Sequence, residues 1–380
     1  MVKPFKVNIP DQIIKDIYDK VKKYPWHEMP NDGGWEYGTN LDYMKKISKY
    51  WTDKFDWRKQ EAKINKYSNF ITKVDDIDIH FIQEKGSGSN PMPLLITHGW
   101  PGSIVEFLDI IEKLAHPERF GGKEEDAFNV IAPSLPGYGF SGRPTHPIGP
   151  RKMADILNKF MTKNLGYKNY LAQGGDWGAT ISNWLGYDHS KTCSAIHINC
   201  LTMRHPDGPQ NKEEKEWQIK FDKDQKMQDG YRTQQATKPQ TLSYGMMDSP
   251  VGVAAWILEK FYFWSDIKNN DIESVYSIDT MLANIMVYII TKTFNTASWI
   301  YYGRREEGGR YFPKGFHRIE VPTAIAHFPK EMSAWPPRSY VDRIFNIKRW
   351  TNMSRGGHFA ALEQPDLLVD DIRAFARTLR

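Results

Sequence analysis

The residues around Asp176 constrain the fold of this chain more than any other stretch. A short apolar run at 170–172 leads into Gly-Gly-Asp-Trp-Gly at 174–178, and a helix-like segment follows. Gly174 and Gly178 stand two residues before and two after Asp176, which is the spacing of a nucleophile elbow, a tight strand-to-helix turn. Small residues are needed at the flanking positions because bulkier ones would clash there. The pattern predicts such a turn, with a carboxylate where Ser usually stands.

Apolar segments of strand character recur along the chain and alternate with helical ones. Short continuous apolar runs, typical of buried parallel strands, occur at about 94–97, 128–132, 169–172 and 195–198. Helical stretches lie between them, at about 103–114, 151–165 and 177–188. Further strand-like segments lie at 70–74, 77–82, 323–326 and 344–347, and a last helix at about 365–379. This alternation predicts a doubly wound, mostly parallel α/β sheet.

The limits of this alternation predict the domain boundaries. Residues 1–66 contain two amphipathic helical stretches and are expected to form an N-terminal helical arm packed on the core. The core is expected to comprise residues 67–202 and 314–380. Between these two parts, residues 203–313 lose the alternation and are helical and rich in aromatic side chains. This segment is therefore predicted to be an inserted helical cap.

The composition is that of an ordinary globular protein and excludes several classes of function. The net charge is only +5 on 380 residues, and Lys and Arg are scattered, so no nucleic-acid partner is expected. The N-terminus lacks a signal-peptide apolar region, and no run approaches the roughly 18 apolar residues of a membrane span. Cys193 and Cys200 flank a predicted buried strand and are expected to be reduced. These features favour a soluble, cytoplasmic protein without a membrane anchor.

Three further motifs accompany the elbow. His-Gly-Trp-Pro-Gly-Ser at 98–103 and Pro-Gly-Tyr-Gly-Phe-Ser at 136–141 each follow a predicted strand, and Gly-Gly-His-Phe-Ala-Ala at 356–361 lies near the end. With these motifs in this order, and Pro-Phe-Lys-Val at 4–7, nearly the whole chain resembles the microsomal family of epoxide hydrolases, which have the α/β-hydrolase fold. The resemblance implies an enzyme, without metal or other cofactor, that converts a small apolar epoxide and water into a vicinal diol.

The resemblance also implies which residues are catalytic. Asp176 is expected to open the epoxide and form a covalent ester, although an Asp at such a position commonly caps the following helix. His358, in the Gly-Gly-His turn, is expected to activate the water that hydrolyses the ester. The chain order of nucleophile, acid and histidine is that of this fold. The acid that orients His358 is expected to be Glu331, with Asp342 as the competitor.

Two cap tyrosines are expected to donate a proton or hydrogen bond to the epoxide oxygen, a task that suits a phenol of pKa about 10. The first is Tyr231. The family's second tyrosine follows a Ser by four positions, which gives Tyr302, with its neighbour Tyr301 as the alternative. The resemblance further implies an oxyanion hole formed by the backbone N–H groups of Trp100 and Trp177, with a cis peptide bond after Trp100.

Two other functions are compatible with parts of this pattern. A haloalkane dehalogenase also uses an Asp elbow and a His base, but it must hold a halide and does not need two tyrosine acids. The alternative from a different class is a non-catalytic binding protein of the same fold. The presence of Asp176, Glu331, His358 and Tyr231 together argues against that alternative.

Overall fold

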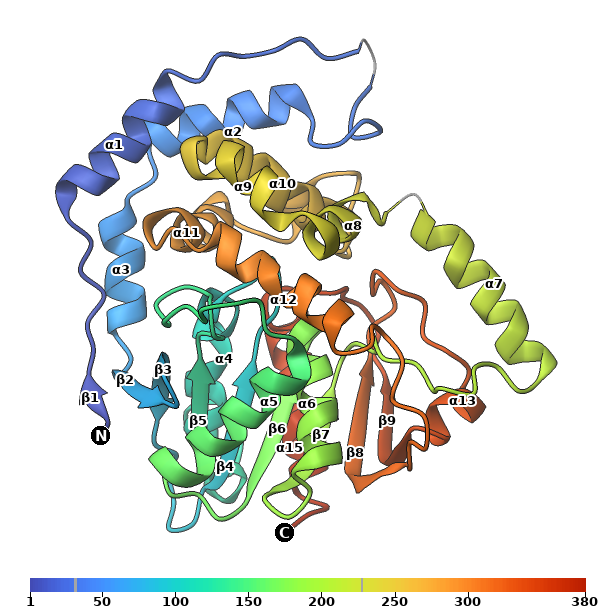
Figure 1. Ribbon diagram of the computed structural model, residues 1–380. Coiled ribbons are helices and arrows are strands. Elements are labelled where there is room, and N and C mark those ends of the chain that lie inside the picture. The colour runs from blue at the N-terminus through green and yellow to red at the C-terminus, as the bar shows by residue number, and fades with distance from the viewer. Residues whose placement is uncertain (31–32, 227) are drawn as a thin grey trace.

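The fold is built on one mixed β-sheet. The computed structural model describes residues 1–30, 33–226 and 228–380. Within these residues the sheet has nine strands in the order β1-β2-β3-β5-β4-β6-β7-β8-β9 (Figure 1). The strands are β1 (Lys3–Pro4), β2 (Asn69–Val74), β3 (Ile77–Glu84), β4 (Met92–Thr97), β5 (Phe128–Pro133), β6 (Tyr170–Gly174), β7 (Cys193–Ile198), β8 (Ile319–His327) and β9 (Phe345–Asn352). Pairing is antiparallel from β1 to β5 and parallel from β5 to β9, which confirms the predicted mostly parallel sheet.

The central strands are covered on both faces. Leu94 and Ile96 of β4 and Leu171 of β6 have no exposed surface, as expected for strands between two helical layers. The covering helices are α4 (Leu108–Ala115), α5 (Pro150–Lys159), α6 (Asp176–Asp188), α14 (Ala360–Glu363) and α15 (Pro365–Ala376). Figure 1 shows α5 and α6 in front of the sheet, with α4 and α15 packed together behind it. Short helical turns complete the core: η1 (Ile104–Phe107), η2 (Pro117–Phe120), η3 (Glu124–Asp126), η4 (Phe160–Asn164) and α13 (Arg338–Asp342).

A helical cap lies over one edge of the sheet (Figure 1). Its elements are α7 (Lys212–Lys226), α8 (Gly230–Thr237), α9 (Pro239–Asp248), α10 (Pro250–Phe263), η5 (Ile272–Ser274), α11 (Ile278–Ile290) and α12 (Phe294–Glu306). Across the described ranges of the chain, no helix combines the length and apolar character needed to cross a bilayer.

The N-terminal arm contacts both the sheet and the cap. β1 pairs with β2 at the sheet edge, and α1 (Asp11–Lys22), α2 (Leu41–Asp53) and α3 (Trp57–Asn65) follow. In Figure 1, α1 and α2 run across the side of the cap that faces away from the sheet. Tyr50 Oη donates a hydrogen bond to Asp279 Oδ1 at 3.0 Å, and Thr39 Oγ1 donates to the Ala255 carbonyl at 2.6 Å. The arm was expected on the core; it also holds the cap from outside.

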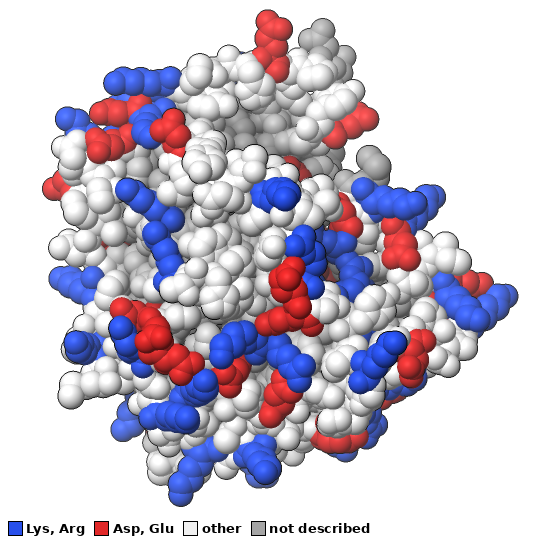
Figure 2. All heavy atoms as spheres, viewed as in Figure 1, with Lys and Arg blue, Asp and Glu red and all other residues white. Residues whose placement is uncertain are grey.

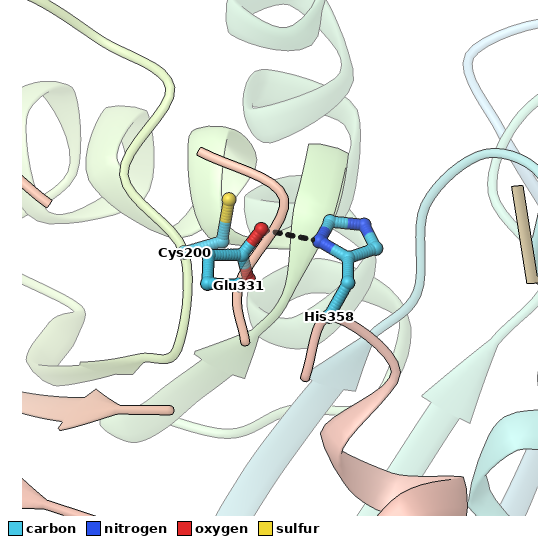
Figure 3. A group of neighbouring side chains, drawn as sticks. All are labelled: Cys200, Glu331 and His358. Atoms are coloured by element: carbon cyan, nitrogen blue, oxygen red, sulfur yellow. Dashed lines mark hydrogen bonds and ion pairs between the residues drawn. The ribbon is translucent and has the colours of Figure 1, made fainter. Parts of the chain in front are cut away.

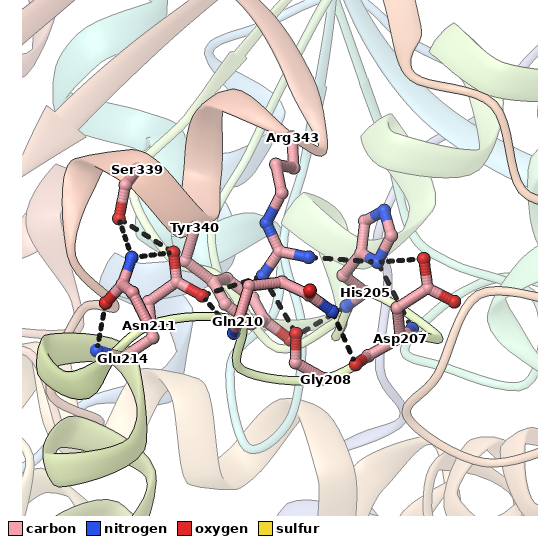
Figure 4. Close-up of polar contacts among 9 residues, drawn as sticks. All are labelled: His205, Asp207, Gly208, Gln210, Asn211, Glu214, Ser339, Tyr340 and Arg343. Carbon is pink, nitrogen blue, oxygen red and sulfur yellow. Dashed lines mark hydrogen bonds and ion pairs between the residues drawn. The ribbon is translucent and has the colours of Figure 1, made fainter.

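A polar network ties the beginning of the cap to the core (Figure 4). Glu214, near the start of α7, accepts hydrogen bonds from Ser339 Oγ at 2.7 Å and from Arg343 Nη2 at 2.9 Å. The backbone N–H of His205 donates to Tyr340 Oη at 2.9 Å. These contacts hold the segment between β7 and α7 against α13. That segment contains Arg204.

Candidate active site

Asp176 stands on a sharp turn between β6 and α6. Its backbone is in the left-handed region, with φ at +46°, a conformation that is strained for a residue with a side chain. A Cβ on Gly174 would overlap the backbone of Gly178, and a Cβ on Gly178 would overlap the carbonyl oxygen of Thr97. Backbone packing therefore requires both glycines. Gly175 occupies the N-cap position of α6, so the capping role considered for Asp176 does not apply.

The loop after β4 brings a backbone donor to the Asp176 carboxylate. The Trp100 N–H donates to Asp176 Oδ1 at 2.7 Å, and the peptide bond between Trp100 and Pro101 is cis. A Cβ on Gly99 would overlap Asp176 Oδ1, so the loop can approach this closely only with glycine there. The Trp177 N–H lies in the first turn of α6 and makes no hydrogen bond to any described residue. It is available as a second donor.

Cap helices hold two of the loops around this centre. Tyr288 Oη on α11 donates to the carbonyl of Gly102, in the loop after β4, at 2.7 Å. Thr296 Oγ1 on α12 donates to the carbonyl of Gly137, in the loop after β5, at 2.6 Å. The motifs at 98–103 and 136–141 are thus attachment points between core and cap.

His358 and Glu331 meet beside Asp176. His358 follows β9, Glu331 follows β8, and His358 Nδ1 lies 2.7 Å from Glu331 Oε1 (Figure 3). His358 Nε2 lies 3.3 Å from Asp176 Oδ2, without the alignment of a hydrogen bond. The competitor Asp342 is half exposed on α13 and pairs with Arg338 at 2.8 Å. The structure therefore brings Glu331, and not Asp342, to His358.

The imidazole of His358 is surrounded by groups that favour its charged form. Burial alone would lower the pKa of His358, but the charge of Glu331 and contacts with Asp176, Cys200 and Glu331 raise it well above its usual range. These contacts favour the imidazolium form of His358. This state depends in part on the negative charge of Asp176.

Cys200 lies beside this pair, and the three side chains have the residue types of a metal site (Figure 3). Ligand atoms on a common zinc ion lie roughly 3.3 Å apart, because each is about 2.0–2.2 Å from the metal. His358 Nδ1 and Glu331 Oε1 are 2.7 Å apart, a hydrogen-bond distance that leaves no room for an ion between them. Burial raises the pKa of the Cys200 thiol to about 12, so it is protonated at neutral pH. The group fits a hydrogen-bonded pair with a neighbouring thiol.

Two cap tyrosines face Asp176. Tyr231 on α8 and Tyr301 on α12 are buried, and their ring centroids lie 5.9 Å apart. Both rings pack on Trp100, at 5.2 Å and 5.8 Å, and Tyr301 also packs edge-on against Trp177 at 4.7 Å. Burial, with the nearby charge of Asp176 adding to it, raises the pKa of both phenols. Both hydroxyls are therefore protonated and able to donate.

Tyr302 does not occupy the expected position. It is half-buried on α12, and the Arg305 guanidinium lies 4.3 Å from its ring centroid. One residue turns a helix by about 100°, so Tyr302 points away when Tyr301 points toward Asp176. The structure places Tyr301, the alternative, and not Tyr302 on the cavity that Asp176 lines.

Comparison with known proteins decides the family. The family model described as epoxide hydrolase N terminus matches residues 2–107, and the one described as alpha/beta hydrolase fold matches residues 92–253. A putative epoxide hydrolase of Stigmatella aurantiaca is 37% identical over 384 residues, covering 100% of this chain and 86% of that protein. The chain belongs to the epoxide hydrolase family.

Other relatives agree with this assignment. Epoxide hydrolase 1 of Sus scrofa is 35% identical over 401 residues, covering 98% of this chain and 88% of that protein. The structure of Aspergillus niger epoxide hydrolase is 29% identical with a TM-score of 0.87, covering 100% of this chain and 97% of that one. The structure of juvenile hormone epoxide hydrolase from Bombyx mori is 26% identical, also with a TM-score of 0.87, covering 100% and 96%. The α/β-hydrolase fold and the hydrolase activity are therefore shown, and the dehalogenase alternative is not favoured.

Two cavities meet at Asp176 in this epoxide hydrolase. One lies on the His358 side and is also lined by Glu106. The other lies on the cap side and is lined by Tyr231 and Tyr301. Burial and the charge of Asp176 raise the pKa of Glu106 to about 8, against the opposing effect of His358. Sequence reasoning missed Glu106 because no pattern in one chain marks a lone glutamate in a short helical turn.

Proposed function

We propose that this epoxide hydrolase opens a small epoxide by attack of Asp176, forms an ester, and hydrolyses that ester to a vicinal diol. The observation that supports the proposal is the position of Asp176 between two sets of groups. Trp100 N–H and His358 lie on the core side, and Tyr231 and Tyr301 lie on the cap side. A carboxylate with a base behind it and proton donors in front suits stepwise ring opening and ester hydrolysis.

In the first step, Asp176 Oδ2 attacks a ring carbon. Oδ1 already accepts the Trp100 N–H, so Oδ2 is the oxygen left to react. The new C–O bond forms as the ring C–O bond breaks, and the epoxide oxygen leaves as an alkoxide. Tyr231 or Tyr301 transfers a proton to that oxygen, which gives a hydroxy ester and a tyrosinate.

Ester formation changes the state of His358. The ester carries no charge, so one of the contacts that raise the pKa of His358 is lost. His358 then releases its proton, and this proton restores the tyrosine. The histidine becomes a base only after the ester has formed.

In the second step, His358 removes a proton from water, and the hydroxide attacks Cγ of Asp176. The resulting oxyanion on Oδ1 is held by the Trp100 N–H and by the free N–H of Trp177. The bond between Cγ and Oδ2 then breaks, and His358 returns its proton to the departing alkoxide. Asp176 is left as a carboxylic acid, and its proton passes to His358, which restores the starting state. Glu331 keeps Nδ1 of His358 protonated and Nε2 directed at the water.

The surroundings of the site support two further parts of the proposal. The rings of Trp100 and Trp177 lie against the tyrosines and suit the apolar body of an epoxide. Cys193 and Cys200 are buried free thiols, in keeping with a reducing compartment. We place the enzyme in the cytoplasm on this ground.

Trapping of the ester tests the proposal. His358→Gln removes the base but not the nucleophile, so styrene oxide should leave one epoxide mass on the peptide that contains residue 176, detected by mass spectrometry. Asp176→Ala is the matched control and should carry no adduct. An adduct on the Asp176→Ala protein, or diol formation by that protein at the wild-type rate, would refute the assignment.

A further inference from the structure

The cavity on the cap side of Asp176 is lined by arginines from separate segments. They are Arg204 after β7, Arg232 on α8, Arg304 on α12 and Arg310 in the loop after α12. Arg232 directly follows Tyr231, and Arg304 follows Tyr301 by three positions on one face of α12. All four arginines line the same cavity as Tyr231 and Tyr301, the proton donors of the proposed reaction.

Three of these arginines lack an ion-pair partner within the described residues, although Asp222 and Asp229 act on Arg310, and Asp176 on Arg304, from farther away. Arg232 forms an ion pair with Asp229. Among the residues that the structure describes, no carboxylate forms an ion pair with Arg204, Arg304 or Arg310. The guanidinium of Arg310 also makes no hydrogen bond within those residues, although it lines the cavity.

Backbone carbonyls satisfy some donors of two arginines without removing the charge. Arg304 Nη2 donates to the Thr202 carbonyl at 2.8 Å, and Arg204 Nη1 donates to the Leu201 carbonyl at 3.1 Å. Arg204 is almost fully buried and lies 4.9 Å from the ring centroid of Trp217. Its Nε is buried and has no partner among the described residues. A buried guanidinium with a free donor is costly unless something occupies that donor.

The arginines disfavour one another's charge. Burial, then the charge of Arg310, lowers the pKa of Arg304 to about 9 and that of Arg204 to about 10. Burial, then the charge of Arg232, lowers the pKa of Arg310. Guanidinium groups in water keep a pKa above about 12. An anion in the cavity would relieve both the crowding and the lost hydration.

The nucleophile does not account for this cluster. Asp176 Oδ2 already lies 3.3 Å from His358 Nε2, and Oδ1 already accepts the Trp100 N–H. Glu331 already pairs with His358, and the carboxylate of Asp176 alone does not balance three guanidiniums. The crowding is also local, because Figure 2 shows Lys and Arg interspersed with Asp and Glu over the visible face.

We propose that the substrate is an epoxide that carries a carboxylate a few bonds from the ring, bound by Arg310 and its neighbours Arg204 and Arg304. This inference rests on the proposed function. The planar fork of a guanidinium matches a carboxylate and can bind it through two hydrogen bonds. The aromatic side chains of the site would then contact only the apolar part of the substrate, between its carboxylate and its epoxide ring. The proposal thus replaces the expectation of a wholly apolar epoxide.

The test compares an acid with its neutral isostere. The values of kcat/KM for 5,6-epoxyhexanoate and 5,6-epoxyhexanamide are measured at one ionic strength, with styrene oxide as a further neutral substrate. The wild-type enzyme should prefer the acid over the amide by about ten- to a hundredfold, the usual effect of a charge-assisted hydrogen bond. The preference should appear mainly in KM.

Variants locate the effect. Arg310→Gln should reduce the acid-to-amide ratio about tenfold, and Arg310→Lys should retain part of it. Arg305→Gln is the control, because Arg305 lies on α12 next to Arg304 but is exposed and pairs with Glu306. It should leave the ratio unchanged.

The outcomes separate the two proposals. A wild-type enzyme that hydrolyses styrene oxide but turns over the amide as well as the acid overturns this inference and leaves the proposed function standing. A preference for the acid that survives in Arg310→Gln overturns the assignment to these arginines. A protein that hydrolyses none of the three epoxides overturns both proposals.

Discussion

The core half and the cap half of the site are built in different ways. On the core side, Asp176 and the Trp100 N–H are held by backbone geometry: a positive φ, a cis peptide bond and glycines that admit no Cβ. On the cap side, Tyr231 and Tyr301 project from helices and are held by packing on Trp100. A residue of the core side cannot be replaced without disrupting the backbone turn that positions it. On the cap side, a shift of one residue along a helix is enough to change which side chain faces the cavity.

The charges of the two halves differ as well. Glu106, on the His358 side, is a carboxyl group with a pKa raised to about 8, so it is largely neutral at pH 7. The cap side instead has the guanidiniums of Arg204, Arg304 and Arg310, none of which forms an ion pair with another described residue. Asp176 lies between these two sides. The His358 side suits a water molecule and a base, and the cap side suits an anionic substrate. The division of charge matches the division between hydrolysis and substrate binding.

The largest expected effect of a single substitution is a slower ester hydrolysis, and it is expected on the core side. Glu331→Gln keeps the shape of the side chain but removes the charge beside His358, so ester hydrolysis should slow by about 10³-fold. Ester formation should slow far less, which pre-steady-state kinetics would detect as accumulated ester. Asp342→Asn is the control and should retain full turnover, because Asp342 pairs with Arg338 on the surface. Equal losses in the two variants would show that the acid is misassigned.

The cap half should separate two neighbouring tyrosines. Tyr301→Phe removes a proton donor near the epoxide oxygen and should lower the rate of ester formation by about 10²-fold. Tyr302→Phe should change it by less than about twofold, since Tyr302 packs under Arg305 away from the cavity. Single-turnover kinetics with styrene oxide measures both. A larger loss in Tyr302→Phe would restore the expectation drawn from sequence.

These two halves also explain what could be predicted from the sequence. The elbow around Asp176 was predictable because close backbone contacts allow only glycine at Gly174 and Gly178. Tyr302 was misplaced because a count from Ser298 does not specify which side of α12 is buried. The arginines carried no signal, since Arg204 and Arg310 lie far apart in the chain and meet only after the cap has folded. Local steric rules are readable from sequence, whereas contacts between distant segments are not.

The smallest expected effect concerns stability. Gly178→Ala places a Cβ against the Thr97 carbonyl and should lower the free energy of unfolding by about 1–3 kcal/mol, with loss of activity. Gly245→Ala is the control in the cap, because a Cβ there meets no atom within 4 Å on α9. It should raise the free energy of unfolding by up to about 1 kcal/mol. If denaturant unfolding shows the same loss of stability in both variants, the proposed difference between the core side and the cap side is contradicted.

Oxygen labelling in a single turnover tests the central claim most directly. The enzyme is mixed, in excess, with an epoxide in water enriched in heavy oxygen. The masses of the diol and of the peptide containing Asp176 are then measured by mass spectrometry. Asp176 Oδ2 should enter the diol, so the first diol should be unlabelled and the label should appear in the Asp176 carboxylate. Label in the first diol, with none in the enzyme, would mean that water attacks the epoxide directly and that no ester forms.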